Sequence, residues 1–206
     1  MHIIIKMSKV EQNKLQKRNA LLDTAFELFT SKGLNRTSIS DIAERAGVAK
    51  GTFYLYFKDK YDIHNRLIAH KASSIFRQAT DALSSHPDIT SVEDRIIFIS
   101  DYVIDVLNKD KSLLTFISKN LSWGVFKNVL IKSKSETDID FREVFLELFS
   151  NSDVTYRNPE VLIFMIIEFV SSTTYSSVLY GEPLSINGLK PYIDTSIRQI
   201  IRGQAL

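Results

Sequence analysis

The sequence contains no cysteine, and only four histidines occur in 206 residues. Without cysteine the chain has no disulfide, no thiolate nucleophile and no cysteine-based zinc site, which fits a reducing cytoplasm. The four histidines include no pair four residues apart and no HExxH motif, so no metal site is predicted. No glycine-rich phosphate loop occurs either. These absences argue against an enzyme, and no cofactor is expected.

Long apolar runs and alternating stretches are also missing. The opening residues, MHIIIKMSK, hold three isoleucines in a row, too few for a signal peptide or a membrane span. The run VLIFMIIEFV at 161–170 is apolar on every side, but ten residues are too short to cross a bilayer. No segment alternates in polarity as a half-buried strand does. We therefore expect an all-α, cytoplasmic chain that does not enter a membrane.

Charge is nearly balanced overall but unevenly distributed. The formal net charge is +2, from 26 Lys and Arg against 24 Asp and Glu. Residues 1–60 hold 11 basic and 6 acidic residues, a balance of +5, while the remainder holds 15 and 18, a balance of −3. A basic N-terminal part followed by a slightly acidic remainder is typical of a protein whose N-terminal part binds nucleic acid.

The stretch TSISDIAERAGVAKGTFYLYFKDK at 37–60 predicts two short helices joined by a tight turn. Thr37 or Ser38 is a suitable N-cap of the first helix, and Gly47 supplies the left-handed conformation that ends it. In the second helix Phe53 and Phe57 are four residues apart, so both are expected to be buried. This is the helix-turn-helix arrangement, whose second helix enters the major groove of DNA. The apolar stripe of the first helix consists of Ile39, Ile42, Ala43 and Ala46.

Within this stretch the runs AGV (46–48), KGTFY (50–54) and YF (56–57) are followed by Lys60. Together with the preceding segment ALLDTAFELFTSKGLNRTS, they closely resemble the DNA-binding domain of TetR-type transcriptional regulators, over about residues 15–68. The resemblance implies an all-helical homodimer with an N-terminal DNA-binding domain and a C-terminal domain that usually binds a small molecule. By the same resemblance, Thr52 and Leu55 lie toward base edges. The implied phosphate contacts and their neighbours in the DNA-binding set are Thr37, Ser38, Lys50, Gly51, Tyr54, Tyr56 and Lys60.

The predicted organisation has three parts. Residues 1–10 form a disordered basic arm, residues 11–58 the helix-turn-helix domain, and residues 59–206 a helical domain for ligand binding and dimerisation. In the last part, Asn158-Pro159 is a typical helix start and Gly181 a typical helix stop, which predicts a helix over 159–180.

The last two predicted helices carry the expected dimer interface. In TetR-type proteins these helices pair with their copies in a second subunit, which implies an interface that includes Val161, Phe164, Ile193, Ile197 and Ile200. The helix over 159–180 also bears a polar stripe of Glu168, Ser171, Ser172 and Tyr175. Two interpretations of this stripe stay open, the wall of a ligand pocket and a hydrogen-bond network within the dimer interface.

Aromatic residues near a predicted helix break at 120–124 suggest an apolar ligand cavity with a few polar groups. Asp101 and Asp105 lie opposite the apolar stripe of their helix and are expected to face solvent, rather than to form an acid pair or a metal site. The candidate ligand-binding residues are Phe98, Tyr102, Phe116, Trp123, Phe126, Glu168, Ser172 and Tyr175.

These observations predict a dimeric regulator that binds a near-palindromic DNA operator. It is expected to be a repressor that a small apolar or amphipathic ligand releases from the operator. The alternative is a ligandless DNA-bound protein that recruits a protein partner through its helical body.

Overall fold

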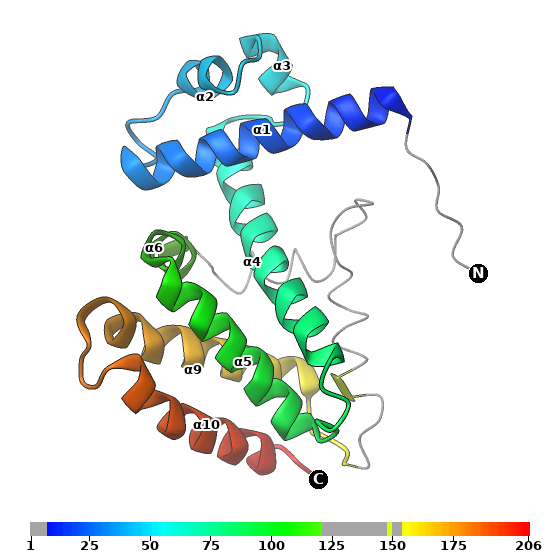
Figure 1. Ribbon diagram of the computed structural model, residues 1–206, viewed down its shortest axis with the longest axis vertical. Coiled ribbons are helices and arrows are strands. Elements are labelled where there is room, and N and C mark those ends of the chain that lie inside the picture. The colour runs from blue at the N-terminus through cyan, green and yellow to red at the C-terminus, as the bar shows by residue number, and fades with distance from the viewer. Residues whose placement is uncertain (1–7, 121–147, 150–153) are drawn as a thin grey trace. The chain divides into compact units, whose positions relative to one another are not determined.

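The computed structural model describes residues 8–120, 148–149 and 154–206. Within these ranges the regular elements are all α-helices, which confirms the all-α prediction (Figure 1). The chain divides into two compact units, residues 1–67 and 68–206. The helices are α1 (Lys9–Ser31), α2 (Ile39–Arg45), α3 (Lys50–Tyr54), α4 (Lys60–Ser84), α5 (Val92–Lys109), α6 (Lys111–Asn120), α9 (Pro159–Tyr180) and α10 (Ile186–Gly203).

Helix α1 begins at Lys9 because Ser8 caps it. The Ser8 hydroxyl accepts a hydrogen bond from the Glu11 amide, and the Glu11 carboxylate accepts one from the Ser8 amide. The predicted disordered arm over 1–10 is thus helical at its last two residues, while residues 1–7 lie outside the described part. The core face of α1 comes from its second half and consists of Leu21, Leu22, Ala25, Leu28 and Phe29.

Helices α2 and α3 form the helix-turn-helix of the N-terminal unit, and α2 packs against both α1 and α3. Ser38 is the N-cap of α2, whereas Thr37 is buried beneath the turn. Gly47 follows α2 with a φ of 69°, which is the left-handed conformation that the sequence predicted. Helix α3 has five residues and ends at Tyr54, so Phe57, which was expected in this helix, lies after its end.

Helix α4 begins in the N-terminal unit and continues into the C-terminal one, since the division falls after Leu67. Ile63 and Leu67 in its first turns are fully buried. His64 is also buried, with its ring edge-on to Phe29 of α1 at a centroid distance of 5.4 Å. Burial lowers the pKa of His64, because an imidazolium would lose its hydration there.

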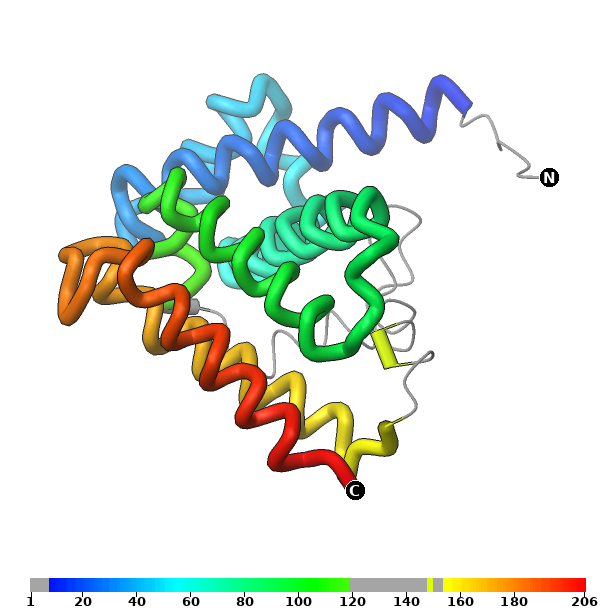
Figure 2. The backbone as a smooth tube through the Cα atoms, turned by 60° about the horizontal axis from the view of Figure 1, so that its bottom comes forward, coloured from blue at the N-terminus to red at the C-terminus, as the bar shows by residue number. Residues whose placement is uncertain are grey.

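The core of the C-terminal unit lies among α5, α6, α9 and α10. Helix α10 packs against α9 and α5, and Figures 1 and 2 both show it running alongside α9. After α10 the chain forms a single antiparallel bridge between Ala205 and Tyr156, with the Leu206 amide 2.9 Å from the Thr155 carbonyl oxygen. The buried residues of this core include Ile96, Ile97, Ile104, Leu114, Leu162, Ile166, Ile193, Ile197 and Ile201.

Helix α9 has the bounds that the sequence predicted. The Asn158 side chain accepts a hydrogen bond from the Val161 amide, Pro159 occupies the first helical position, and Gly181 ends the helix at a φ of 73°. Of the helices that the structure describes, α9 is the one long and apolar enough to cross a membrane by length and composition. Core helices of soluble proteins meet the same criterion, and Leu162 and Ile166 of α9 are core residues.

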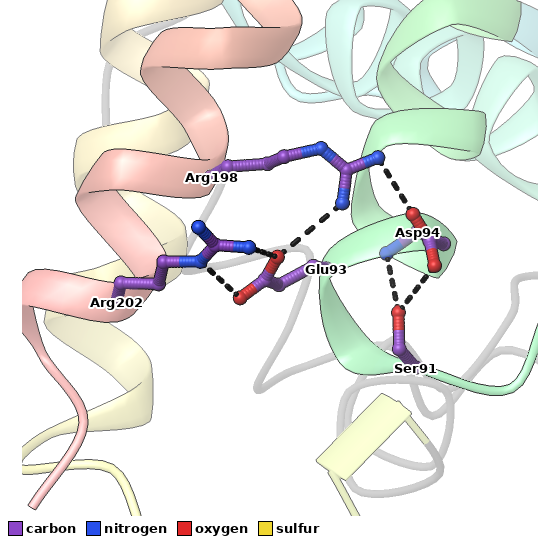
Figure 3. A network of polar contacts seen from close by, with 5 residues as sticks. All are labelled: Ser91, Glu93, Asp94, Arg198 and Arg202. Atoms are coloured by element: carbon purple, nitrogen blue, oxygen red, sulfur yellow. Dashed lines mark hydrogen bonds and ion pairs between the residues drawn. The ribbon is translucent and has the colours of Figure 1, made fainter.

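An ionic network joins the start of α5 to the end of α10 (Figure 3). The Arg198 guanidinium donates to Glu93 at 3.3 Å and to Asp94 at 2.7 Å, while Arg202 donates to both Glu93 oxygens at 3.0 and 3.1 Å. These donors, Arg202 first, lower the pKa of Glu93 below its usual value. The Ser91 hydroxyl and Arg198 do the same for the pKa of Asp94.

A second polar contact between α5 and α10 corrects one expectation. Asp101 and Asp105 do not face solvent alone, because Lys190 of α10 lies 3.5 Å from Asp101 and 2.8 Å from Asp105. Asp194 is one turn further along α10, and burial followed by the charge of Asp101 raises its pKa. One carboxylate oxygen of Asp194 is shielded from solvent without a hydrogen-bond donor within the described structure, and the shielded oxygen of Asp101 is the one that has the Lys190 ammonium at 3.5 Å.

Candidate nucleic-acid interface

Two phenylalanines fix the orientation of α3. Phe53 is fully buried and Phe57 nearly so, and their ring centroids lie 5.6 Å apart. Phe53 lies within α3 and Phe57 follows it, with the Phe57 amide donating to the Phe53 carbonyl at 3.0 Å, so both rings hold the same side of this turn against the core and the opposite side of α3 faces solvent. The second helix of the motif is thereby held by its core side and presents its polar side.

The outward side of α3 carries most of the residues predicted to touch DNA. Lys50, Gly51, Tyr54 and Leu55 are exposed, and the exposed fractions of Tyr54 and Leu55 are 52% and 79%. Thr52 and Tyr56 are half-buried at the flanks. Apart from Thr37, Ser38 and Lys60, which precede or follow α3, the predicted set thus lies on or beside one short helix.

Gly51 has no neighbour that requires a glycine. A Cβ atom built at this position meets no atom within 4 Å, and its φ is not in the left-handed range. Gly33, Gly47 and Gly181, by contrast, have φ values of 83°, 69° and 73°, which explain their identity. The protein itself therefore gives no packing or backbone reason for glycine at position 51.

Thr37 does not lie where the resemblance implied a phosphate contact. Its side chain is buried, and its hydroxyl donates to the Gly33 carbonyl at 2.9 Å and to the Leu28 carbonyl at 3.4 Å. Its amide donates to the Leu34 carbonyl at 3.3 Å. The structure thus gives Thr37 a different role, which is to fold the turn between α1 and α2.

Ser38 is exposed and caps α2. Its hydroxyl accepts a hydrogen bond from the Asp41 amide at 3.1 Å, and the Asp41 carboxylate accepts one from the Ser38 amide at 3.0 Å. These bonds lower the pKa of Asp41. Because the Ser38 hydroxyl is the acceptor in this cap, its own O–H remains to donate to an anion at the N-terminal end of the motif, where a helix favours negative charge.

Lys60 also has partners inside the N-terminal unit. Its ammonium lies 3.1, 3.4 and 3.5 Å from the carbonyl oxygens of Leu34, Asn35 and Thr37. It is also 5.7 Å from the ring centroid of Tyr61. An ammonium has three donors, so these carbonyls account for its hydrogen-bonding capacity. The structure places Lys60 as a support of the α1–α2 turn rather than as a charge on an open surface.

Other basic side chains lie on the surface of this unit. Lys9, Lys14 and Lys17 are exposed on the first half of α1, and of these Lys9 lies in the arm that was predicted to be disordered. Arg45 of α2, in contrast, pairs with Glu27 of α1 at 2.8 Å on an exposed surface. The exposed lysines supply charge for a phosphate backbone, whereas Arg45 is partly neutralised by its own chain.

The predicted ligand-binding residues that the structure describes differ in burial. Phe116 is buried, Phe98, Tyr102 and Tyr175 are half-buried, and Glu168 and Ser172 are exposed, while Trp123 and Phe126 lie outside the described residues. A cavity of about 180 Å³ occurs elsewhere in the C-terminal unit. It is lined by Thr80, Leu83, Ser84, His86, Pro87, Ile89, Arg95 and Leu148. The His86 ring, 4.9 Å from that of Phe98, connects the cavity to one predicted residue.

The predicted dimer interface needs a correction at its two central residues. Ile193 and Ile197 are 1% and 0% exposed and belong to the core within one chain, so they are not available to a second subunit. Phe164 and Ile200 are half-buried, and Val161 is 43% exposed. The apolar stripe of α10 was identified correctly, but it packs against α5 and α9 of the same chain.

The buried Phe53–Phe57 pair, the capped α2 and the exposed side of α3 define a helix-turn-helix protein of the DNA-binding class. The sequence model for bacterial regulatory proteins of the tetR family matches residues 21–67, the part of the chain that contains the helix-turn-helix, which supports a transcriptional regulator of the tetR type.

Individual relatives agree with this assignment. YvdT of Bacillus subtilis, named an uncharacterized HTH-type transcriptional regulator, is 33% identical over 110 residues, about half of each chain (53% and 55%). The HTH-type transcriptional repressor KstR2 of Rhodococcus jostii is 23% identical over 190 residues, which cover 91% of this chain and 89% of that one. The crystal structure of a TetR transcriptional regulator from Rhodococcus sp. RHA1 is similar in fold, with a TM-score of 0.64 at 18% identity, over 92% and 97% of the two chains.

Proposed function

We propose that this protein is a dimeric transcriptional repressor that binds operator DNA through α3 and that a small ligand in the C-terminal unit releases it. The observation that carries the proposal is the side of α3 opposite Phe53 and Phe57, where Lys50, Tyr54 and Leu55 are exposed. A family in which such helices read DNA supports the same assignment.

In this proposal the contacts divide by chemistry. Lys50 and the phenol of Tyr54 hold phosphates, which fixes the register of α3 without reading sequence. Thr52 and Leu55 lie nearer the bases, where the major groove presents a different pattern for each base pair. Two copies of α3 must reach successive major grooves about 34 Å apart, or a multiple of this, so the operator should be a near-palindrome.

The proposed dimer surface is the exposed stripe of α9. Val161, Met165, Glu168 and Ser172 are exposed and recur at intervals of four, three and four residues, so they share one side of the helix. The apolar residues at one end and the polar ones at the other suit an interface with an apolar part and a hydrogen-bonded part. We assign Glu168 and Ser172 to the interface, because neither lines the described cavity.

Two observations support a ligand-released repressor. The relative KstR2 aligns over nine-tenths of this chain and is named a repressor. The cavity in the C-terminal unit has apolar walls from Leu83, Ile89 and Leu148, with Arg95 and His86 as polar groups, which suits a small amphipathic molecule. Release requires that the ligand prefer a conformation whose two copies of α3 no longer fit the operator.

The test begins with a footprint on the DNA upstream of the protein's own gene, followed by affinity measurements at several salt concentrations. Lys50→Ala should weaken binding to all sequences and lower the slope of log affinity against log salt by about one for each phosphate that is no longer neutralised. The matched control is Lys109→Ala, since Lys109 is an exposed lysine in the C-terminal unit. An unchanged slope in Lys50→Ala together with an altered base preference would contradict the assigned role.

A protein that recruits a partner without a ligand gives a different result. It would bind the same operator, but no small molecule would raise its melting temperature or lower its affinity for DNA. In a ligand-released repressor, operator DNA lowers ligand affinity by the same factor by which ligand lowers operator affinity. Reciprocity of these two factors separates the two functions.

A further inference from the structure

Leu55 is the most exposed large apolar side chain among the residues that the structure describes, at 79%. Its backbone, with φ −72° and ψ −22°, continues the helical course of α3 by one residue. Phe53 and Phe57, two residues before and after Leu55, are the buried core residues of this segment, so the Leu55 side chain adds little to the core of its own chain. A single exposed leucine is ordinary on a protein surface, so only the position of Leu55 indicates a function.

That position is one turn along α3 from Gly51. Residues four apart lie on the same side of a helix, so Leu55 and the open backbone of Gly51 face the same way. A Cβ at Gly51 would meet no atom within 4 Å, so this side of α3 is open to close approach by another molecule. Lys50 and Tyr54, also four apart and exposed, form the adjoining polar edge.

We propose that Leu55 selects thymine in the operator by packing against its 5-methyl group. This inference rests on the proposed operator binding through α3. In the major groove thymine alone among the four bases presents an apolar group, and the other base edges present donors and acceptors. Leucine has neither donor nor acceptor, so it gains contact at thymine and leaves polar groups unmatched at the other bases.

The test replaces the methyl group without changing base pairing. An operator is first selected from a random DNA pool with the wild-type protein, and is then prepared with thymine or with uracil throughout. Loss of one buried methyl group should weaken wild-type binding about fourfold per half-site, or about 15-fold for two half-sites. Single uracil substitutions should then locate the effect at one symmetric pair of positions.

Leu55→Ala should bind the thymine operator more weakly and should no longer distinguish it from the uracil operator. The variant should fold normally, because the replaced side chain is exposed and its backbone is helical. Leu206→Ala is the matched control, since Leu206 is 76% exposed at the other end of the chain. That control should keep both the affinity and the preference for thymine.

Each outcome decides a separate point. If the pool yields no preferred sequence, the proposed function fails before Leu55 is tested. If wild-type protein binds thymine and uracil operators equally, the thymine inference is overturned while operator binding stands. A third outcome is that Leu55→Ala keeps the full preference for thymine, including the case in which its affinity decreases by the same factor for the thymine and the uracil operator. Another residue then contacts the methyl group, and the assignment to Leu55 is overturned.

Discussion

Replacement of Gly51 by alanine separates the needs of the fold from those of DNA binding. Glycine within a helix is less favourable than alanine by about 0.5–1 kcal/mol, because it loses more backbone freedom on folding. No atom lies within 4 Å of the added Cβ, and the φ of Gly51 is not in the left-handed range. Since α3 is short and position 51 is in its first turn, a gain of about 0.5 kcal/mol is expected. Gly51→Ala should therefore raise the melting temperature by about 1–2 °C.

The same methyl group should weaken operator binding. If the α3 backbone approaches a phosphate closely at Gly51, the added methyl group displaces it and costs a hydrogen bond to a charged group, worth about 1.5–3 kcal/mol. That corresponds to a decrease of at least about tenfold in affinity for each half-site. Fluorescence anisotropy with a labelled operator measures the affinity, and differential scanning fluorimetry measures the melting temperature of the same preparation.

Gly203→Ala is the matched control for this experiment. Gly203 is the last residue of α10, it also has open space around a built Cβ, and its φ is not left-handed. This control should leave operator affinity unchanged. The reasoning is refuted if Gly51→Ala is stabilised and binds the operator with wild-type affinity, because the backbone would then not approach the DNA. A lower melting temperature would show instead that Gly51 has a role within the fold.

Four further outcomes follow from the same structure. Val161→Asp should give a folded monomer in light scattering, whereas Ile197→Asp should unfold the C-terminal unit in circular dichroism, because an unpaired carboxylate is costly in a core; a dimeric Val161→Asp would move the interface elsewhere. Burial raises the pKa of Asp194 in the folded protein above 3.8, so the free energy of unfolding decreases as the pH rises through that folded-state pKa. The melting temperature of Asp194→Asn should therefore exceed that of the wild type at pH 7 but not near pH 3.8. Burial lowers the pKa of His64 in the folded protein below 6.5, so on acidification the unfolded chain is protonated before the folded one and the free energy of unfolding decreases below pH 6.5. The melting temperature of His64→Gln should lack the part of the acid-induced decrease that His64 causes. Lys60→Met should weaken operator binding without changing the salt slope, since the ammonium lies on backbone carbonyls; a slope lowered by one would restore it as a phosphate contact.

Features set by neighbouring residues were predicted well. The bounds of α9 follow from Asn158-Pro159 at one end and Gly181 at the other, and the end of α2 follows from Gly47. The helix-turn-helix is also local, because its packing depends on Phe53 and Phe57 four residues apart. Each of these signals acts within one or two turns of the chain, so the sequence contains it in readable form.

Features set by distant residues were not predictable in the same way. Arg198 bonds Glu93 across 105 positions, and Lys190 reaches Asp101 and Asp105 from another helix. A helical stripe shows which side of α10 is apolar, but it does not show whether that side is covered by α5 and α9 or by a second subunit. Ile197 was therefore placed in the wrong environment although its side of the helix was right.

The contacts of Lys60 relate the start of α4 to the DNA-binding motif. Lys60 in the first turn of α4 holds the turn that precedes α2, through the carbonyl oxygens of Leu34, Asn35 and Thr37. One to two turns later, the Arg66 guanidinium lies 5.8 Å from the ring centroid of Phe57, which follows α3. The start of α4 thus contacts the motif at both of its ends. Because α4 continues beyond Leu67 into the C-terminal unit, a displacement of its first turns acts on the turn before α2 and on Phe57 together. Such a displacement would reorient α2 and α3 as one body, which is the kind of change that a ligand-released repressor requires.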